Sequence, residues 1–334
     1  MTFGAVLFGS FELASPETNA PMFCPMVFLI EWAGPNAWYY LWAFLSVFVL
    51  VFNILYPVVI APLFNTFTPL EDEAAPSKDN EKEKAADDKE DEGKDKEGEK
   101  DEGVEGEKKD DGPRVTVPGL KQGIQDLIAQ TGLACKAVFE VDGSRQSSHS
   151  NAYVAGMCGS KRIVVYDTLI RDIMDSPGVD KQGIFAIIGH EIGHSIMHHT
   201  WALLAVTQVN FLSMFGTFGF VQNAPGLVTD FGFALPANPT AAAFLLIQCY
   251  LTVYGLVMPI FSIFMNAFTR RLEFSADAYS ARLGFDLGPP LIAISKKNLS
   301  DCNPDWLASM CHDNHPTLIE RLRALGRLQG GKRD

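Results

Sequence analysis

The chain has 334 residues, of which 47% are hydrophobic, and a formal net charge of −13. Residues 71–111 hold nine lysines against twenty acidic residues, so this one segment carries −11 of that charge. The acidic balance therefore describes one segment rather than a binding surface, and we expect no nucleic-acid partner. The six cysteines are scattered without a C-x-x-C pair, which argues against a disulfide framework and against a cysteine zinc site.

The N-terminal part predicts one membrane helix. Residues 1–37 receive no structural assignment, because prolines and glutamates interrupt their apolar stretches. Residues 38–62 are uncharged, begin with a cluster of aromatic side chains and are long enough to cross a bilayer, so we expect a transmembrane helix there. A buried core helix is the less favoured alternative.

The acidic segment predicts no fold of its own. Residues 71–111 contain almost no apolar side chain, so they cannot bury enough surface to offset the entropy of an ordered chain. We expect a disordered, solvated insertion, and a binding tail is the less favoured alternative.

The next part of the chain predicts a small mixed α/β region. Apolar residues recur at helical spacing over 118–130 and 168–174, and β-rich segments occupy 137–141, 151–156 and 162–166. Asp167 precedes the second of these helices and is expected to cap it.

Two more uncharged runs predict two further membrane helices, over residues 203–220 and 243–268. Arg270 and Arg271 follow at once, which by the positive-inside rule places the C-terminal part in the cytosol. The fold class expected is therefore a mainly α, polytopic membrane protein with a small β-sheet and about three transmembrane helices.

A metal-binding motif lies between the sheet segments and the second span. His190, Glu191 and His194 form the pattern H-E-x-x-H. Residues four apart share one face of a helix, so the two imidazoles can bind one metal ion while Glu191 takes a proton from an activated water. A buried helix with two hydrogen-bonded histidines is the less favoured alternative.

A catalytic metal site of this kind needs a third protein ligand. Glu273 is the candidate, with Asp277 four residues later on the same helical face to support a ligating histidine. The alternative is an exposed acidic pair, which like-charge repulsion disfavours. His198 continues the spacing of the two motif histidines and is interpreted as a helix-surface histidine or as support for a ligand. Thr200 stands where some metallopeptidases carry a third histidine.

At these residues the sequence resembles the type I CaaX prenyl proteases, membrane-integral zinc endopeptidases of the gluzincin kind. The resemblance runs from about residue 38 to 328 and rests on six segments in order. They are IAPLFNTFTPL (60–70), VDGSRQSSHSNAYVAG (141–156), KRIVVYDTLI (161–170), GHEIGHSIMHHT (189–200), RRLEFSADAYSARLG (270–284) and HPTLIERLRAL (315–325).

The resemblance implies one zinc ion per chain, with Glu191 as general base and a ligand set of His190, His194 and Glu273. It implies that Asn151 and Ala152 bind the substrate backbone, that His315 holds the substrate or the developing oxyanion, and that Arg321 is structural. It also implies a zinc metallopeptidase domain over 112–334, and further membrane helices before residue 38, for which this sequence begins too late.

The function that the resemblance implies is release of the C-terminal -aaX tripeptide from prenylated CaaX proteins. The expected partners are a prenylated protein or peptide substrate and the lipid bilayer, and the expected location is the endoplasmic reticulum membrane with the active site facing the cytosol. A general membrane quality-control metalloprotease with the same site stays open as an alternative. So does a truncated, catalytically inactive membrane protein.

Overall fold

The computed structural model describes residues 32–71, 115–144, 149–156, 161–234 and 236–330. The chain forms two compact units, one from residues 1–44 with 211–255 and the other from residues 45–210 with 256–334. The acidic segment beyond residue 71 and residues 1–31 lie outside the described part of the chain, so the expectations stated for them stay predictions.

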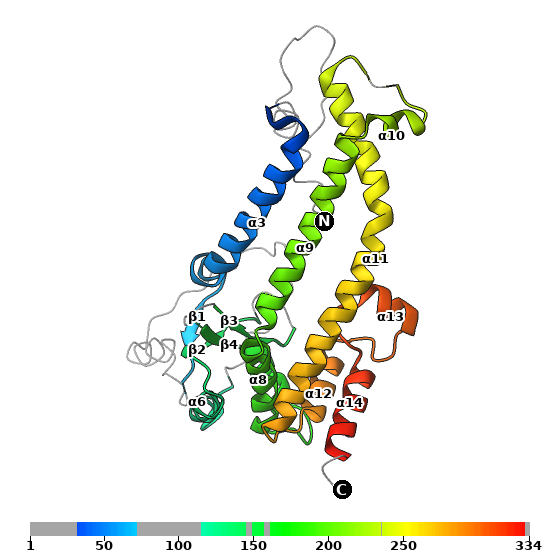
Figure 1. The fold of residues 1–334 in the computed structure, drawn as a ribbon. Helices are drawn as coiled ribbons and strands as arrows, with labels where there is room; N and C mark the ends of the chain where they lie inside the picture. The colour runs from blue at the N-terminus through cyan, green and yellow to red at the C-terminus, as the bar shows by residue number, and fades with distance from the viewer. Residues whose placement is uncertain (1–31, 72–114, 145–148, 157–160, 235, 331–334) are drawn as a thin grey trace, which may run out of the picture. The chain divides into compact units, whose positions relative to one another are not determined.

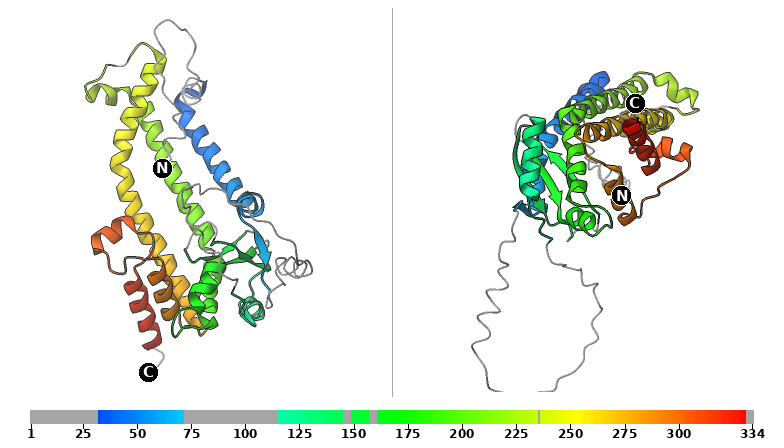
Figure 2. Two further views of the ribbon diagram at one scale, coloured as in Figure 1. Left: turned by 180° about the vertical axis from the view of Figure 1, so that it is seen from behind. Right: turned by 90° about the horizontal axis from the view of Figure 1, so that it is seen from below.

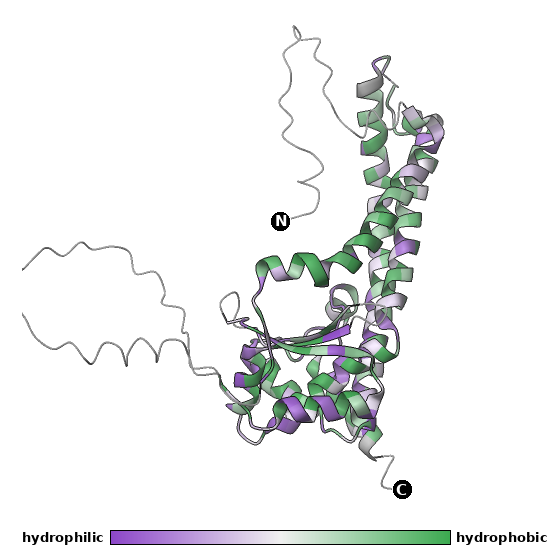
Figure 3. Cartoon of the chain, turned by 90° about the vertical axis from the view of Figure 1, so that its left-hand side faces the viewer, coloured by the Kyte–Doolittle hydropathy of each residue, from purple (hydrophilic) through white to green (hydrophobic). Residues whose placement is uncertain are grey.

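Three long helical segments confirm the expected membrane architecture (Figure 1). They are long and apolar enough to cross a bilayer, and Figure 3 shows them coloured mainly as hydrophobic. The first segment, Gly34–Phe64, joins η1 (Gly34–Asn36), α3 (Ala37–Leu55), the π-turn η2 (Tyr56–Ile60) and α4 (Ala61–Phe64). The second is α9 (His199–Gln222), and the third lies within α11 (Pro239–Arg282).

Helix α11 is longer than the membrane span predicted from the sequence. Its 44 residues continue past the two arginines that follow the apolar run, and Pro259 lies inside it. The residues from 260 to 282 contain neither glycine nor proline, so nothing in the sequence stops the helix before Gly284, which has a φ of +96°. One helix therefore carries both membrane-compatible residues and the acidic residues Glu273 and Asp277.

The first unit has a small apolar core of its own. Val221, Val228 and Cys249 are buried together, where α9 ends and α10 (Pro225–Asp230) and α11 follow. Gly219 lies against the indole of Trp38, and a Cβ there would come within 2.4 Å of that ring. A larger residue at this position would therefore push the indole away.

The described strands of the second unit form one four-stranded sheet in the order β1-β2-β4-β3. The strands are β1 (Phe67–Pro69), β2 (Cys135–Val141), β3 (Ala152–Ala155) and β4 (Lys161–Tyr166). β2 and β4 run parallel, whereas β1 and β3 are antiparallel to their neighbours. The three strands expected from the sequence are confirmed. β1 was not expected, because three residues are too few for an alternating pattern to be recognised.

Helices pack against this sheet and against one another around the main core (Figures 1 and 2). They are α6 (Leu120–Thr131), α7 (Asp167–Met174) and α8 (Lys181–Ile196), with α12 (Gly288–Lys297) and α14 (Leu318–Gly330) later in the chain. Helix α13 (Trp306–His312) lies beside α11 instead, where Asn266 and Arg270 donate hydrogen bonds to it. Ile184, Ile188 and Ile192 of α8 are fully buried, and burial of each such side chain stabilises the fold by about 1.5–3 kcal/mol. The apolar face of α8 therefore fixes its position beside β3.

Two local expectations were wrong. Helix α8 ends at Ile196, and His198 has a left-handed φ of +57° before α9 begins, so His198 does not continue the helical face of the motif histidines. Asp167 is the first residue of α7, and the N-cap position is occupied by Tyr166. The Asp167 carboxylate accepts hydrogen bonds from the backbone N–H groups of Thr168 and Gly143, both at 2.8 Å, and so ties the end of β2 to α7.

Candidate functional site

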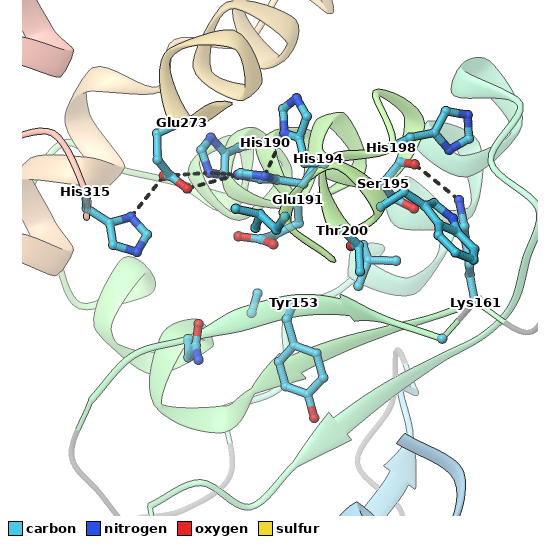
Figure 4. Close-up of a pocket in the computed structure, with 17 residues that line it drawn as sticks. Tyr153, Lys161, His190, Glu191, His194, Ser195, His198, Thr200, Glu273 and His315 are labelled. Atoms are coloured by element: carbon cyan, nitrogen blue, oxygen red, sulfur yellow. Dashed lines mark hydrogen bonds and ion pairs between the residues drawn. The ribbon is translucent and has the colours of Figure 1, made fainter. Parts of the chain in front are cut away.

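Helix α8 brings the two motif histidines together. His190 and His194 lie one turn apart, and their Nε2 atoms are 3.1 Å from each other (Figure 4). His190 is buried, and the His194 side chain is 22% exposed. The packing of the opposite face of α8 against the core therefore turns both imidazoles toward one point.

Glu273 reaches the same point from α11. Its carboxylate oxygens lie 3.6 Å from Nε2 of His190 and 3.3 Å from Nε2 of His194. The three ligand atoms lie within 4.8 Å of one another, and Glu273 is buried. Two imidazole nitrogens and a carboxylate so close together repel one another unless a proton or a cation lies between them, so the three residues could hold a metal ion.

Asp277 supports His190 from behind. Its Oδ1 lies 2.8 Å from Nδ1 of His190, the ring nitrogen that faces away from the cluster. Arg321 of α14 pairs with the same carboxylate through Nε at 2.8 Å and Nη2 at 2.5 Å. The structure thus places Asp277 beside His190 and balances its buried charge with an arginine.

Glu191 lies next to His190 in the chain and lines the same cavity. Burial raises the pKa of its carboxyl group above the usual value. In Figure 4 the carboxylate lies on the side of the histidine pair that faces β3. Glu191 is therefore placed to exchange a proton with a group that enters between the cluster and the strand.

Two cavities meet at the cluster, with volumes of about 360 Å³ and 740 Å³. Both are lined by Asn151 and Ala152, at the start of β3, and by His190 and Glu273, whereas His194 lines only the smaller one. β3 is an edge strand of the described sheet, and Tyr153 and Val154 of this strand also line the smaller cavity. An extended peptide can add to such an edge by main-chain hydrogen bonds.

His315 also reaches the cluster. Its Nδ1 lies 3.1 Å from Oε2 of Glu273, and its side chain is 62% exposed. The hydrogen bond to Glu273 raises the pKa of His315. His315 lines both cavities, as Asn151 and Ala152 do.

Sequence reasoning missed His199. This residue begins α9, is 5% exposed, and has Nδ1 2.9 Å from Nδ1 of His194. The spacing from His194 is five residues, which on a continuous helix points away from the motif face. The left-handed turn at His198 interrupts the helix and turns the His199 side chain toward His194. His199 could have been identified from the sequence only if this turn had been predicted.

Comparisons with known proteins agree with the site. Residues 116–329 match the model of peptidase family M48, and residues 18–66 match a model described as the CAAX prenyl protease N-terminal region with five membrane helices. A CAAX prenyl protease 1 homolog from Arabidopsis thaliana is 35% identical over 308 residues, which cover 91% of this chain and 59% of the relative. CAAX prenyl protease 1 from Saccharomyces cerevisiae is 32% identical, over 86% of this chain and 55% of the relative.

The crystal structure of S. mikatae Ste24p is similar with a TM-score of 0.64 and 29% sequence identity, covering 90% of this chain and 61% of that one. The chain thus spans about three fifths of the length of these relatives. The match to the family model covers well over half of the chain and includes both helices that carry the cluster. The chain belongs to peptidase family M48.

Proposed function

We propose that this protein is a zinc-dependent membrane endopeptidase that removes the C-terminal -aaX tripeptide from prenylated CaaX proteins. The observation that carries the proposal is the convergence of His190, His194 and Glu273 beside the edge strand β3. The substrate class comes from the relatives, which are named as CAAX prenyl proteases.

The donor set fits zinc. Two imidazole nitrogens and one carboxylate are a common ligand set of catalytic zinc, which leaves a fourth position open. Ligand atoms about 2.0–2.1 Å from a tetrahedral ion lie roughly 3.3 Å from one another. The separations in this cluster are 3.1, 3.3 and 3.6 Å. A zinc ion held here supplies Lewis acidity, which polarises a peptide carbonyl and makes a water molecule more acidic.

The residues around the cluster would share the remaining work. Glu191 acts as general base and then passes the proton to the leaving amine. Asn151 and Ala152 hold the substrate backbone at the edge of the sheet. His315 has Nδ1 on Glu273 and leaves Nε2 for a substrate oxygen or the developing oxyanion.

The cellular setting is also part of the proposal. We propose one zinc ion per chain, a metallopeptidase domain over 112–334, and an active site on the cytosolic side of the endoplasmic reticulum membrane. The positive-inside argument rests mainly on Arg271, which is exposed. Arg270 binds both carboxylate oxygens of Glu320 at 2.6 Å and so has a structural partner.

The direct test is mass spectrometry of a farnesylated CaaX peptide incubated with the purified chain in lipid nanodiscs. Loss of the three C-terminal residues, abolished by a chelator and by Glu191→Gln, supports the proposal. Equal cleavage of an unprenylated twin would favour a general quality-control protease. No cleavage of either peptide by the zinc-loaded protein would favour a catalytically silent membrane protein.

A further inference from the structure

We propose that His199 is the positioning residue of His194: it accepts the Nδ1 proton of His194 and thereby directs Nε2 of His194 to the metal ion. This role depends on the metal site proposed above and adds a residue to it outside the H-E-x-x-H motif. The same contact explains why a buried histidine begins a membrane-compatible helix.

A continuous chain of polar contacts runs away from the cluster. Nε2 of His194 faces Glu273 at 3.3 Å, and its other nitrogen, Nδ1, lies 2.9 Å from Nδ1 of His199. Nε2 of His199 lies 3.2 Å from Oγ of Ser275. The Ser275 hydroxyl in turn donates to the backbone carbonyl of Leu272 at 2.8 Å.

These contacts allow one consistent placement of protons when a cation is bound. A ring nitrogen that binds a cation carries no proton, so neutral His194 keeps its proton on Nδ1 and donates it to His199. Nδ1 of His199 is then the acceptor, so neutral His199 carries its ring proton on Nε2. From there it donates this proton to Oγ of Ser275. Ser275 has already given its hydroxyl proton to Leu272. Every donor in this series of four contacting residues therefore has one acceptor.

Burial makes this placement hard to change. His199 is 5% exposed, and a rotation of its ring would break its contacts with both His194 and Ser275. Ser275 lies two residues after Glu273 on α11. One helix therefore supplies a proposed ligand and also the anchor that orients another ligand.

The two histidine ligands are supported by different chemistry. His190 faces the carboxylate of Asp277, whose charge is balanced by Arg321. His194 faces a neutral imidazole. A carboxylate in place of His199 would add a second buried negative charge near Glu273. The described contacts of His199 include no arginine that could balance this charge. A neutral hydrogen-bond acceptor therefore fits this position better.

The test compares zinc affinity among variants of the full chain in lipid nanodiscs, by competition with a chromophoric chelator. His199→Leu removes the acceptor at similar size and is expected to weaken zinc binding about 10–100-fold. His199→Asn keeps an oxygen acceptor near the position of Nδ1 and is expected to recover most of that affinity. The matched control is His198→Asn. His198 is the adjacent, exposed residue, and asparagine tolerates its left-handed backbone conformation. This control variant is expected to bind zinc as the wild type does.

The outcomes separate this role from the proposed metal site. A wild-type chain that binds no zinc would overturn the proposed function itself. Normal zinc binding by His199→Leu, or equal losses in His199→Leu and His199→Asn, would overturn only the role of His199. Long-range ¹H–¹⁵N spectra of the zinc-loaded wild type decide the matter even if a variant does not fold. Protons on Nδ1 of His194 and Nε2 of His199 support the role, and a proton on Nδ1 of His199 refutes it.

Discussion

Arg321 donates two hydrogen bonds to the Asp277 carboxylate, from Nε at 2.8 Å and from Nη2 at 2.5 Å. Oδ1 of Asp277 also lies 2.8 Å from Nδ1 of His190. The Arg321 and Asp277 side chains are 15% and 2% exposed, so solvent screens the pair only weakly. This ion pair joins α14 to α11 beside the cluster of His190, His194 and Glu273.

Loss of Arg321 should destabilise the fold. Arg321→Ala leaves the Asp277 carboxylate buried without its cation, which is expected to cost about 3–5 kcal/mol, measured by thermal or denaturant unfolding. Arg323→Ala, which removes an exposed arginine from the same helix, is the control and should change stability little. If the double variant Asp277→Ala/Arg321→Ala is no more stable than Arg321→Ala, the buried carboxylate is not the cause.

Glu191→Gln should separate metal binding from turnover. Glu191 contributes no atom to the three-residue cluster, so zinc content measured by mass spectrometry should stay near one per chain. Cleavage of the farnesylated peptide should fall by about 10²–10⁴-fold, the usual contribution of a general base. Loss of zinc from this variant would mean that Glu191 is a ligand.

Metal removal should lower stability as well as activity. The proposed site binds zinc only in the folded chain, so saturation at 100 times the dissociation constant should raise the free energy of unfolding by about 2.7 kcal/mol. A chelator should reverse this stabilisation, and added zinc should restore it. Glu273→Gln should show little response to either treatment, and a full response in this variant would remove Glu273 from the ligand set.

The metal-free protein should show a pH-dependent contact at His315. Because the hydrogen bond to Glu273 raises the pKa of His315 in the fold, protonated His315 stabilises the fold below its unfolded pKa of about 6.5. That contribution is lost as the pH rises through the raised value. The difference in Tm between wild type and His315→Asn should therefore shrink toward alkaline pH. A difference that grows instead would show that the pKa is lowered.

Cysteine labelling should define the membrane topology. In a background with the native cysteines replaced by serine, Asp175→Cys and Arg327→Cys should react on the same face of sealed vesicles, because two proposed spans separate them. Asp230→Cys, after one proposed span, should react only from the opposite face. Opposite accessibility of the first two positions would contradict a peptidase domain on one side.

The sequence by itself determined the class of fold and placed two histidines on one face of a helix. Residues 190 and 194 share a helical face because of the period of the α-helix, and the uncharged runs are long enough to cross a bilayer. The three longer strands were also predictable, because their residue types and spacing are local properties. None of these inferences required contacts between distant parts of the chain.

Only the tertiary structure decided how the site is supported. Arg321 meets Asp277 across 44 positions of sequence, and Ser275 meets His199 across 76. No spacing rule connects such residues, because their meeting depends on how α8, α9, α11 and α14 pack. The left-handed turn at His198 is the decisive case: after this turn His199, rather than His198, contacts His194.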